Sequence, residues 1–218
     1  MKKLIIYGAG VQTRQFLTEI EHYGTADPAA LTVDRDYLKE DRVFGLPVIA
    51  FEDLAQYPPE DYDMLVIGAY GRQRLVENMY RKAKEKGYRL INYISPQALI
   101  DVEPVMGDNN IIYAGAFLGF DGQMGSGNII RQQVYLGHEF RIGNLNVFSP
   151  GCNIGGMVHV GDRCWIGLGA NVRDKISIGD DCTIGMGAAV VKSVESYAVA
   201  TGVPARVVAY QQEKGVWL

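Results

Sequence analysis

The sequence predicts an α/β domain with a parallel sheet, followed by a triangular β-solenoid. Two observations lead to this fold class. Strand-like and helix-like segments alternate up to residue 94, which is typical of a parallel sheet with helical crossovers. From residue 100 to residue 190, large apolar residues recur at every sixth position, a period that neither a helix nor a flat strand produces.

The N-terminal pattern indicates a small Rossmann-like domain over residues 1–94. The expected elements are a strand, a glycine-rich turn and a helix in 2–20, a strand in 30–34, a strand in 63–68, a helix in 72–87 and a further strand in 88–94. Residues 95–101 are the expected junction with the solenoid.

The apolar repeat predicts a solenoid domain over residues 95–192, with a C-terminal cap or tail in 193–218. Each hexapeptide is expected to form one short strand and one corner, with its apolar residue pointing inward. Three hexapeptides then close a coil of 18 residues. The inward positions are Ile100, Met106, Ile112, Leu118, Met124, Ile130, Leu136, Ile142, Phe148, Ile154, Val160, Ile166, Val172, Ile178, Ile184 and Val190.

Glycines and cysteines occupy fixed slots of the repeat. Glycine follows the inward residue in most repeats, where we expect it to relieve a tight turn. The three cysteines, Cys152, Cys164 and Cys182, all lie two positions before an inward residue, so we expect small buried wall residues with reduced thiols. Because no CxxC occurs, a thiolate zinc site is not expected.

Composition excludes several classes of function. The net charge of −4 and the lack of a basic stripe argue against a nucleic-acid partner. No apolar stretch is long enough for membrane insertion. Gly8 and Gly10 interrupt the apolar run near the N-terminus, which is too short for a signal peptide, so we expect a cytoplasmic protein.

Three stretches resemble a known family. They are IGGMVHVGDRCWIGLGANV at 154–172, ISIGDDCTIGMGAAVV at 176–191, and TGVPARVV at 201–208. They are similar to the hexapeptide-repeat left-handed β-helix sugar acyltransferases, which include UDP-bacillosamine and GDP-perosamine N-acetyltransferases and sialic acid O-acetyltransferases. The resemblance covers nearly the whole chain and implies the left-handed coil. It also implies an acetyl-CoA-dependent N-acetyltransferase that acts on a nucleotide-linked amino sugar in bacterial surface glycan synthesis.

In the resembled family the N-terminal domain binds the nucleotide sugar. The turn after the first strand cradles phosphate or sugar through backbone N–H groups, and an acid after the second strand holds the base or ribose. The substrate-binding residues implied here are Gly8, Gly10, Val11, Gln12, Asp34, Gly68 and Tyr70. The first turn departs from the Gly-Gly-His that is common in the family. It also lacks the third glycine of a dinucleotide fingerprint, which disfavours NAD.

His138 is the expected general base. It lies two residues after the inward Leu136, near a corner, where side chains point outward and can reach a neighbouring subunit. The resemblance implies catalysis by a histidine followed by an acid, and His138 and Glu139 match this pair. A neutral imidazole titrates near pH 6.5, and a carboxylate on its other ring nitrogen would fix the tautomer. Successive residues of a strand point apart, so Glu139 can serve His138 only if the corner bends the chain.

The resemblance places the remaining catalytic and cofactor residues. Gly156, one coil after His138, is the expected backbone donor to the oxyanion. Coenzyme A contacts map onto Val147, Gly156, Leu168 and Met186, although the family often has histidine at the position of Val147. The resemblance implies that solenoid flanks pack three-fold, and a corner residue such as His138 would need a neighbour to complete its site, so we expect a homotrimer with active sites between subunits.

Other functions remain open at this level. A sugar O-acetyltransferase of the sialic acid type would use the same base and groove. A non-catalytic nucleotide-sugar-binding scaffold would not need His138 beside the Gly156 turn. A carbonic-anhydrase-like metal solenoid would need three converging histidines, and the solenoid contains only His138 and His159, so no metal is expected.

Overall fold

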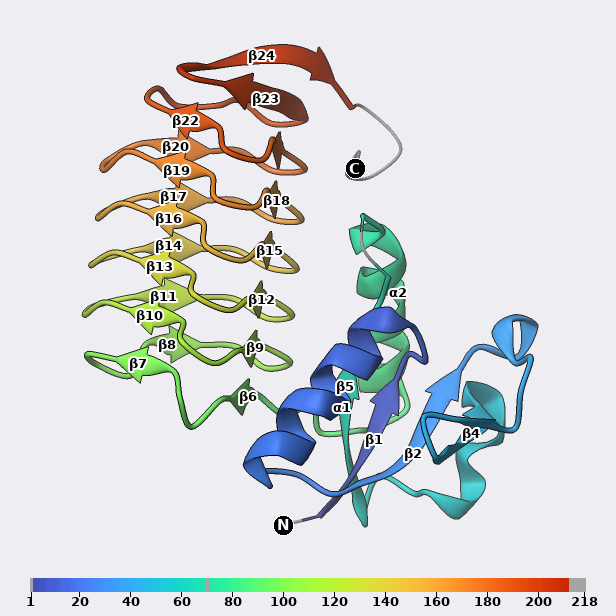
Figure 1. Ribbon diagram of the computed structural model, residues 1–218. Coiled ribbons are helices and arrows are strands. Elements are labelled where there is room, and N and C mark those ends of the chain that lie inside the picture. Colours follow the sequence, from blue (N-terminus) through green and yellow to red (C-terminus); the bar gives the residue numbers. More distant parts are fainter. Residues whose placement is uncertain (1, 70, 212–218) are drawn as a thin grey trace. The chain divides into compact units, whose positions relative to one another are not determined.

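The computed structural model describes residues 2–69 and 71–211. The chain divides into two compact units (Figure 1). The first unit is Met1–Asn92, and the second begins at Tyr93. In the described part of the chain, no helix has the length and apolar character needed to cross a bilayer.

The first unit is built around a five-stranded sheet with the order β3-β4-β2-β1-β5. Four strands are parallel, and β3 pairs antiparallel with β4 in a hairpin at the sheet edge. The strands are β1 (Lys3–Tyr7), β2 (Pro28–Val33), β3 (Arg42–Val43), β4 (Leu46–Ala50) and β5 (Tyr62–Val66). The parallel sheet agrees with the sequence pattern, which did not predict β3 and β4. A Rossmann-like classification stays a prediction.

Helices pack against the apolar strands of this sheet. The packed helices are α1 (Val11–Tyr23), η2 (Phe51–Gln56) and α2 (Gln73–Glu85), whereas the short η1 (Arg35–Tyr37) has no buried residue. Met79 and Ala83 of α2 join Ile5, Met64 and Val66 in one buried cluster. Burial of such side chains is worth about 1.5–3 kcal/mol each, so this packing holds the strand ends where the following turns begin.

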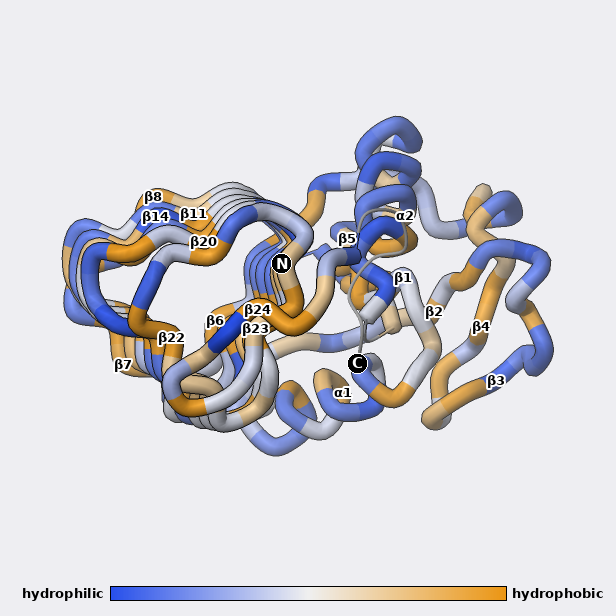
Figure 2. The backbone as a smooth tube through the Cα atoms, turned by 90° about the horizontal axis from the view of Figure 1, so that it is seen from above, coloured by the Kyte–Doolittle hydropathy of each residue, from blue (hydrophilic) through white to orange (hydrophobic). Residues whose placement is uncertain are grey.

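From β6 to β22, the second unit is a stack of two-residue parallel strands that form three faces (Figure 2). Face 1 consists of β7 (Leu99–Ile100), β10 (Phe117–Leu118), β13 (Tyr135–Leu136), β16 (Asn153–Ile154), β19 (Asn171–Val172) and β22 (Ala189–Val190). Face 2 consists of β8 (Val105–Met106), β11 (Gln123–Met124), β14 (Arg141–Ile142), β17 (His159–Val160) and β20 (Ser177–Ile178).

Face 3 has the most strands, and it contains both the first and the last strand of the second unit. It consists of β6 (Tyr93–Ile94), β9 (Ile111–Ile112), β12 (Ile129–Ile130), β15 (Val147–Phe148), β18 (Trp165–Ile166), β21 (Thr183–Ile184), β23 (Ala198–Gly202) and β24 (Ala205–Tyr210). Strands 18 residues apart pair in register throughout, as Val147 does with Trp165. The predicted period is therefore confirmed.

In each strand from β7 to β22, the second residue is the predicted inward residue. From Ile112 to Val190 these side chains are buried in one continuous core, which also contains Cys152, Cys164 and Cys182. All three cysteines are free, as predicted. Ile100 and Met106, at the first coil, are only partly buried because fewer neighbours cover them.

The glycines that follow the inward residues have a different role from the one predicted. None of them has a positive φ; the left-handed residue is instead the third after the inward position, as in Glu139 and Met157. A Cβ on Gly119 would meet the backbone of Gly137 and His138 at 2.9 Å. These glycines are required because adjacent coils approach too closely for a side chain.

The expected strand at 88–94 is wrong. Leu90 makes only an isolated bridge to Met64, and Tyr93–Ile94 pairs with β9 as the first strand of face 3. The physical reason is that Ile94 lies six residues before Ile100, so it occupies an inward position of the apolar repeat and packs with the solenoid. At the other end, β23 and β24 form an antiparallel hairpin that extends face 3.

Candidate functional site

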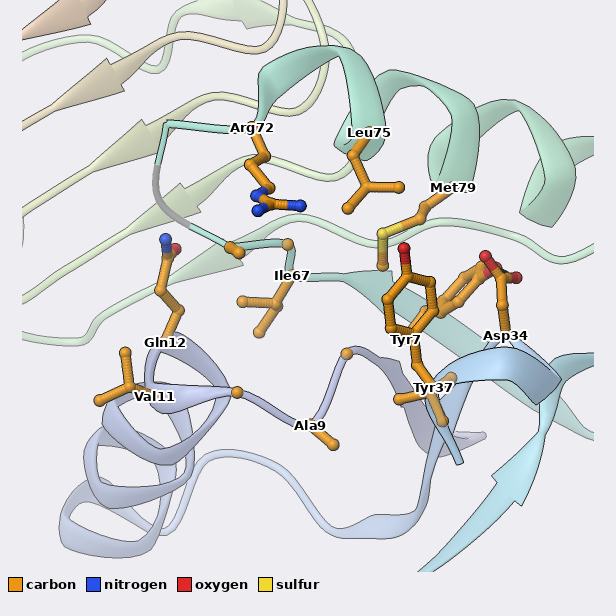
Figure 3. A pocket seen from close by; sticks show the side chains of 15 residues that line it. Tyr7, Ala9, Val11, Gln12, Asp34, Tyr37, Ile67, Arg72, Leu75 and Met79 are labelled. Carbon is orange, nitrogen blue, oxygen red and sulfur yellow. Dashed lines mark hydrogen bonds between the residues drawn. The ribbon is translucent and has the colours of Figure 1, made fainter. Parts of the chain in front are cut away.

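A cavity of about 390 Å³ opens in the first unit, where β1, β2 and β5 end (Figure 3). The carboxyl ends of parallel strands are the usual place for ligands in such sheets. The lining residues are Tyr7, Gly8, Ala9, Gly10, Val11, Gln12, Val33, Asp34, Tyr37, Ile67, Gly68, Ala69, Arg72, Leu75 and Met79.

Glycines shape the floor of this cavity in two ways. Gly8 has φ +135°, and a Cβ there would lie 1.9 Å from the carbonyl oxygen of Ile67. A Cβ on Gly68 would lie 2.1 Å from Val76. Both positions therefore require glycine for the protein's own packing. Gly10 differs, because a Cβ there would meet nothing within 4 Å. Its missing side chain leaves open space at the start of α1.

Asp34 follows β2 and is held by two donors. Its Oδ1 accepts a hydrogen bond from Lys82 Nζ at 2.8 Å and another from the Tyr7 hydroxyl. Burial, followed by the bond to Asp34, raises the pKa of Tyr7 above its usual range. Asp34 Oδ2 makes no hydrogen bond to the described residues, so one carboxylate oxygen is available to a ligand.

The structure brings most of the predicted substrate residues together. Six of the seven line the cavity: Gly8, Gly10, Val11, Gln12, Asp34 and Gly68. Tyr70 lies outside the described residues. Sequence reasoning missed Tyr37, Arg72, Leu75 and Met79. Arg72 could have been found from its place directly after a strand-ending turn, at the start of the next helix.

In the second unit, His138 and Glu139 form a hydrogen-bonded pair. The Nδ1 atom of His138 lies 3.0 Å from Oε2 of Glu139. Glu139 has φ 56°, so the chain bends at this corner and brings the carboxylate back to the preceding ring. The two side chains are 42% and 40% exposed, which leaves the pair open to a ligand.

The imidazole of His138 lies between residues of the neighbouring coils. The Phe120 ring stacks on it with centroids 5.2 Å apart and planes inclined by 11°. On the other side, a Cβ on Gly156 would lie 2.4 Å from Nε2 of His138. Only glycine leaves room for the ring here. Phe120 was not predicted, although it stands 18 residues before His138 and is thus the equivalent residue of the previous coil.

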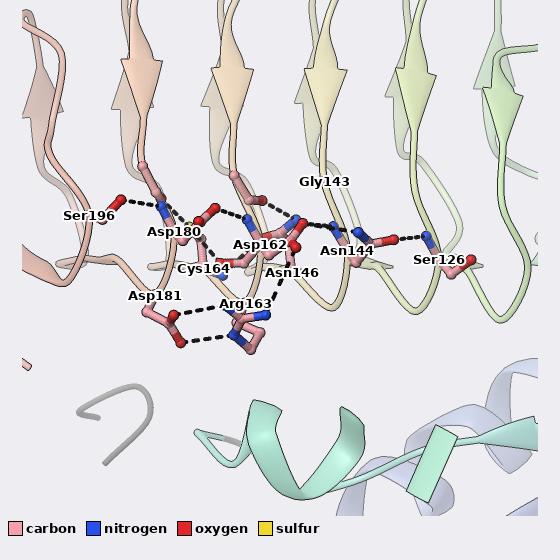
Figure 4. A network of polar contacts seen from close by, with 12 residues as sticks. Ser126, Gly143, Asn144, Asn146, Asp162, Arg163, Cys164, Asp180, Asp181 and Ser196 are labelled. Carbon is pink, nitrogen blue, oxygen red and sulfur yellow. Dashed lines mark hydrogen bonds and ion pairs between the residues drawn. The ribbon is translucent and has the colours of Figure 1, made fainter. Parts of the chain in front are cut away.

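The backbone N–H of Gly156 makes no hydrogen bond within the described residues. The corner between faces 2 and 3 contrasts with this one (Figure 4). There, side chains cap the equivalent N–H groups: Asn144 N donates to Asp162 Oδ1 at 2.7 Å, and Asp162 N donates to Asp180 Oδ1 at 2.8 Å. The N–H of Gly156 is therefore available to a ligand, whereas the equivalent N–H groups at the corner between faces 2 and 3 are already hydrogen-bonded.

Three of the four predicted cofactor residues lie on two different corners of one subunit, and Val147 lies within β15 of face 3. Leu168 and Met186 follow strands of face 3 and are 52% and 76% exposed. Gly156 follows a strand of face 1. Val147 is only 7% exposed and offers little surface to a ligand, so its contact stays a prediction. Face 1 separates the two corners, and one subunit therefore does not bring these residues together.

The described residues include no group of three or more His, Cys, Asp or Glu side chains that could hold a metal ion. His159, the other solenoid histidine, lies on face 2 in β17 and pairs with Arg141 and Ser177 through the strand ladder. It is therefore on a different element from the His138 corner.

Nearly the whole chain is similar in structure to acyltransferases of known structure. No protein-family model matches the chain, and no curated protein matches it in sequence. Structures do match. The perosamine N-acetyltransferase from Caulobacter crescentus, as a histidine-to-asparagine variant with CoA and GDP-perosamine, has a TM-score of 0.86 at 27% identity. This match covers 96% of this chain and 98% of that one.

Two further neighbours share the fold over the same length. The acetyltransferase domain of PglB from Neisseria gonorrhoeae, in complex with acetyl coenzyme A, has a TM-score of 0.85 at 25% identity and covers 95% of this chain and 99% of that one. WeeI from Acinetobacter baumannii has a TM-score of 0.79 at 21% identity, covers 95% and 100% of the two chains, and supports the fold alone.

The fold and these neighbours define the class of the protein: it is an acyltransferase, similar in structure to the hexapeptide-repeat sugar acyltransferases. Its stacked parallel strands fit a left-handed β-helix acetyltransferase. The resemblance stated from the sequence, and the assignment to the acyltransferases, are confirmed.

Proposed function

We propose that the protein transfers an acetyl group from acetyl-CoA to the amino group of a nucleotide-linked amino sugar. Neighbours that match nearly the whole chain hold CoA with GDP-perosamine, or acetyl coenzyme A. The cavity of the first unit would hold the nucleotide sugar, with Asp34 Oδ2 accepting from the ribose or base. Cytoplasmic location and a role in surface glycan synthesis remain predictions.

One observation carries the proposed chemistry: His138 Nε2 and the Gly156 N–H lie on one corner, and neither has a hydrogen-bond partner among the described residues. A neutral imidazole with its proton on Nδ1, held by Glu139, presents a lone pair on Nε2. The Gly156 N–H supplies the donor that a tetrahedral oxyanion requires. A base and an oxyanion donor side by side suit acyl transfer.

The reaction then proceeds by addition and elimination. The sugar amine attacks the thioester carbonyl carbon, and its excess proton passes to Nε2 of His138. Gly156 N–H stabilises the negative oxygen of the tetrahedral intermediate. The carbon–sulfur bond breaks, the imidazolium returns its proton to the departing thiolate, and the products are the amide and CoA.

The proposed assembly is a homotrimer. The cofactor residues Leu168 and Met186 lie across face 1 from His138 and Gly156, so a neighbouring subunit is needed to place them beside the base. The outer side of face 1 suits an interface, because Phe117 and Tyr135 stack there with ring centroids 5.0 Å apart. Two copies that meet at this face would form the groove for the pantetheine arm.

Acetyl transfer is tested by measuring free CoA thiol with purified protein, acetyl-CoA and a panel of GDP- and UDP-linked amino sugars. The matched controls are the same nucleotide sugars with a hydroxyl in place of the amine. We expect turnover that requires the amine. Turnover with the hydroxyl sugars alone would contradict the proposal and favour O-acetylation. Absence of turnover with every acceptor, while acetyl-CoA binds, would contradict the nucleotide-sugar assignment.

A further inference from the structure

The cavity of the first unit has two chemically different ends (Figure 3). Asp34, Tyr7 and Tyr37 lie at one end. Arg72 and Gln12 point toward each other at the opposite end, Arg72 from the start of α2 and Gln12 from the first turn of α1. Apolar residues line the stretch between them: Ile67, Leu75 and Met79. A ligand that spans this cavity therefore meets a carboxylate at one end and a cation at the other.

The side chain of Arg72 makes no ion pair or hydrogen bond within the described residues; only its backbone carbonyl is bonded, by the N–H of Val76 at 3.1 Å. The carboxylate of the cavity, Asp34, is already paired with Lys82 at 2.8 Å. Arg72 is thus a cavity cation without a local counter-charge. A guanidinium binds phosphate with two parallel N–H donors, which makes an anion with several oxygens the natural partner.

Gln12 is a second, independent sign of a ligand at this end. The residue is only 3% exposed, and its Oε1 is buried without a hydrogen-bond partner in the described structure. An unsatisfied buried acceptor is unfavourable by about 1–3 kcal/mol, so a donor from a ligand would relieve it. Phosphate oxygens only accept, whereas a sugar hydroxyl donates.

The start of α1 adds donors for the anion at this end. Gly10 caps the helix without a side-chain hydrogen bond, and the first turn contains no acidic residue. The first N–H groups of such a helix lack internal partners and favour negative charge. The open space at Gly10 leaves the approach to these groups clear.

We propose that Arg72 binds the diphosphate of the nucleotide sugar and that Gln12 Oε1 accepts a hydrogen bond from a hydroxyl of the attached sugar. The nucleoside then lies at the Asp34 and Tyr37 end. This inference rests on the proposed function, because it fixes the direction in which that substrate lies. It also makes Arg72 the residue that distinguishes a nucleoside diphosphate from the bare nucleoside.

The inference is tested by calorimetric titration of GDP, UDP, guanosine and uridine into the protein without acetyl-CoA. We expect Arg72→Gln to weaken binding of the preferred diphosphate by about 10- to 100-fold, while the matching nucleoside changes by less than about twofold. Arg72→Lys should recover part of the loss. Arg81→Gln is the matched control, because it removes the same charge from α2 at a residue that pairs with Glu85 outside the cavity.

Gln12→Met tests the second contact. With the nucleotide sugar that the wild type acetylates, we expect affinity to fall by about 2- to 10-fold, and affinity for the diphosphate alone to stay unchanged. An equal loss for both ligands would contradict the contact between Gln12 and the sugar.

Three outcomes would overturn the role of Arg72: unchanged diphosphate binding in Arg72→Gln, an equal loss of nucleoside binding, or the same loss in Arg81→Gln. Acetyl transfer by the wild type distinguishes this failure from that of the proposed function. Normal turnover with an unchanged KM in Arg72→Gln would refute the inference alone. If the wild type binds neither GDP nor UDP and acetylates no nucleotide sugar, both fail.

Discussion

The backbone dihedral φ of Glu139 determines whether its carboxylate can reach the ring of His138. Its φ of 56° turns the corner after β13, so that the carboxylate reaches back to Nδ1 of His138. In an extended strand the two side chains would point to opposite sides. Gly156 completes the arrangement, because any side chain there would collide with the imidazole. The geometry of the proposed base therefore depends on two backbone positions, Glu139 and Gly156, in adjacent coils.

The proposed base predicts a large kinetic defect on its removal. We expect His138→Ala and His138→Asn to lower kcat by about 10²–10⁴ at pH 7, because the amine would lose its proton acceptor. Acetyl-CoA binding should persist. The defect should shrink at higher pH, where more of the substrate amine is already neutral. The measurement is kcat across pH, and retention of more than about a third of wild-type kcat at pH 7 would exclude His138 as the base.

Gly8 and Gly10 lie two residues apart but should respond oppositely to the same substitution. Gly8→Ala should destabilise the fold by about 1–3 kcal/mol, because its backbone is left-handed and Ile67 occupies the space. Gly10→Ala should leave the melting temperature nearly unchanged and weaken nucleotide binding, because its methyl group enters the open cavity. Thermal unfolding and titration with GDP or UDP measure both effects. Equal destabilisation by the two variants would contradict this account.

At the scale of elements, hydrogen-bonded pairing between short strands of successive coils stabilises the solenoid, and no long strand contributes within the coils. Each strand from β9 to β19 has two residues, of which the second lies in the core, and pairs with strands in the coils before and after it. Glycines after the inward residues allow the coils to approach closely, and left-handed residues turn the corners. Every coil therefore depends on its neighbours, and a core defect affects several of them.

Phe148 is a large, fully buried core residue of face 3. We expect Phe148→Ala to lower the free energy of unfolding by about 3–5 kcal/mol, since the cavity it leaves is bounded by coils that cannot collapse inward. The exposed Val105→Ala on face 2 is the control and should change little. Chemical denaturation measures both, and similar effects from the two variants would contradict the packing described.

The core thiols should be unreactive in the native protein. Cys152, Cys164 and Cys182 are all fully buried, and burial raises the pKa of Cys152 to about 12. Its reactive thiolate is therefore scarce at pH 8, and reagent access is blocked. A thiol reagent should titrate three groups only after denaturation. Rapid labelling of the folded protein would contradict the burial, and it would also add background to assays of CoA release.

On the scale of the whole molecule, the two corners that flank face 1 carry different parts of the proposed site. His138 and Gly156 are on one corner, and Leu168 and Met186 are on the other. In a three-fold assembly, unlike corners of adjacent subunits can meet. The site would then be complete only in the oligomer.

Mixed oligomers test this arrangement. His138→Ala and Met186→Glu should each abolish most activity alone. If one site uses His138 from one subunit and Met186 from the next, co-expression of the two variants should restore about one quarter of the wild-type activity, because random assembly pairs intact contributions at that frequency. Light scattering should give a trimeric mass. No recovery in verified mixed oligomers would place each site within one subunit, and a monomeric mass would contradict the assembly itself.

Much of the fold could be predicted from local pattern. The inward residues follow a fixed spacing, because a solenoid repeats the same short contact in every coil, and most of the cavity residues lie directly after predicted strands. The prediction failed where the same residues fit two patterns. Tyr93 and Ile94 suited a strand of the first sheet, yet their phase places them in the solenoid. Arg72 lies on a helix that carries many charged residues, and only its position identifies it.

The sequence by itself determined the two-part organisation, the six-residue period, the buried cysteines and the His138 and Glu139 pair as neighbours in the chain. Periodicity can do this because it records which residues face the core. Tertiary structure decided the rest. The bend at Glu139, the stacking of Phe120 on His138, the open N–H of Gly156 and the cavity shared by Gln12 and Arg72 all depend on atoms from separate coils or elements. Such contacts form only when the chain folds, because local spacing in the sequence gives no information about the distance between segments that are far apart in the chain.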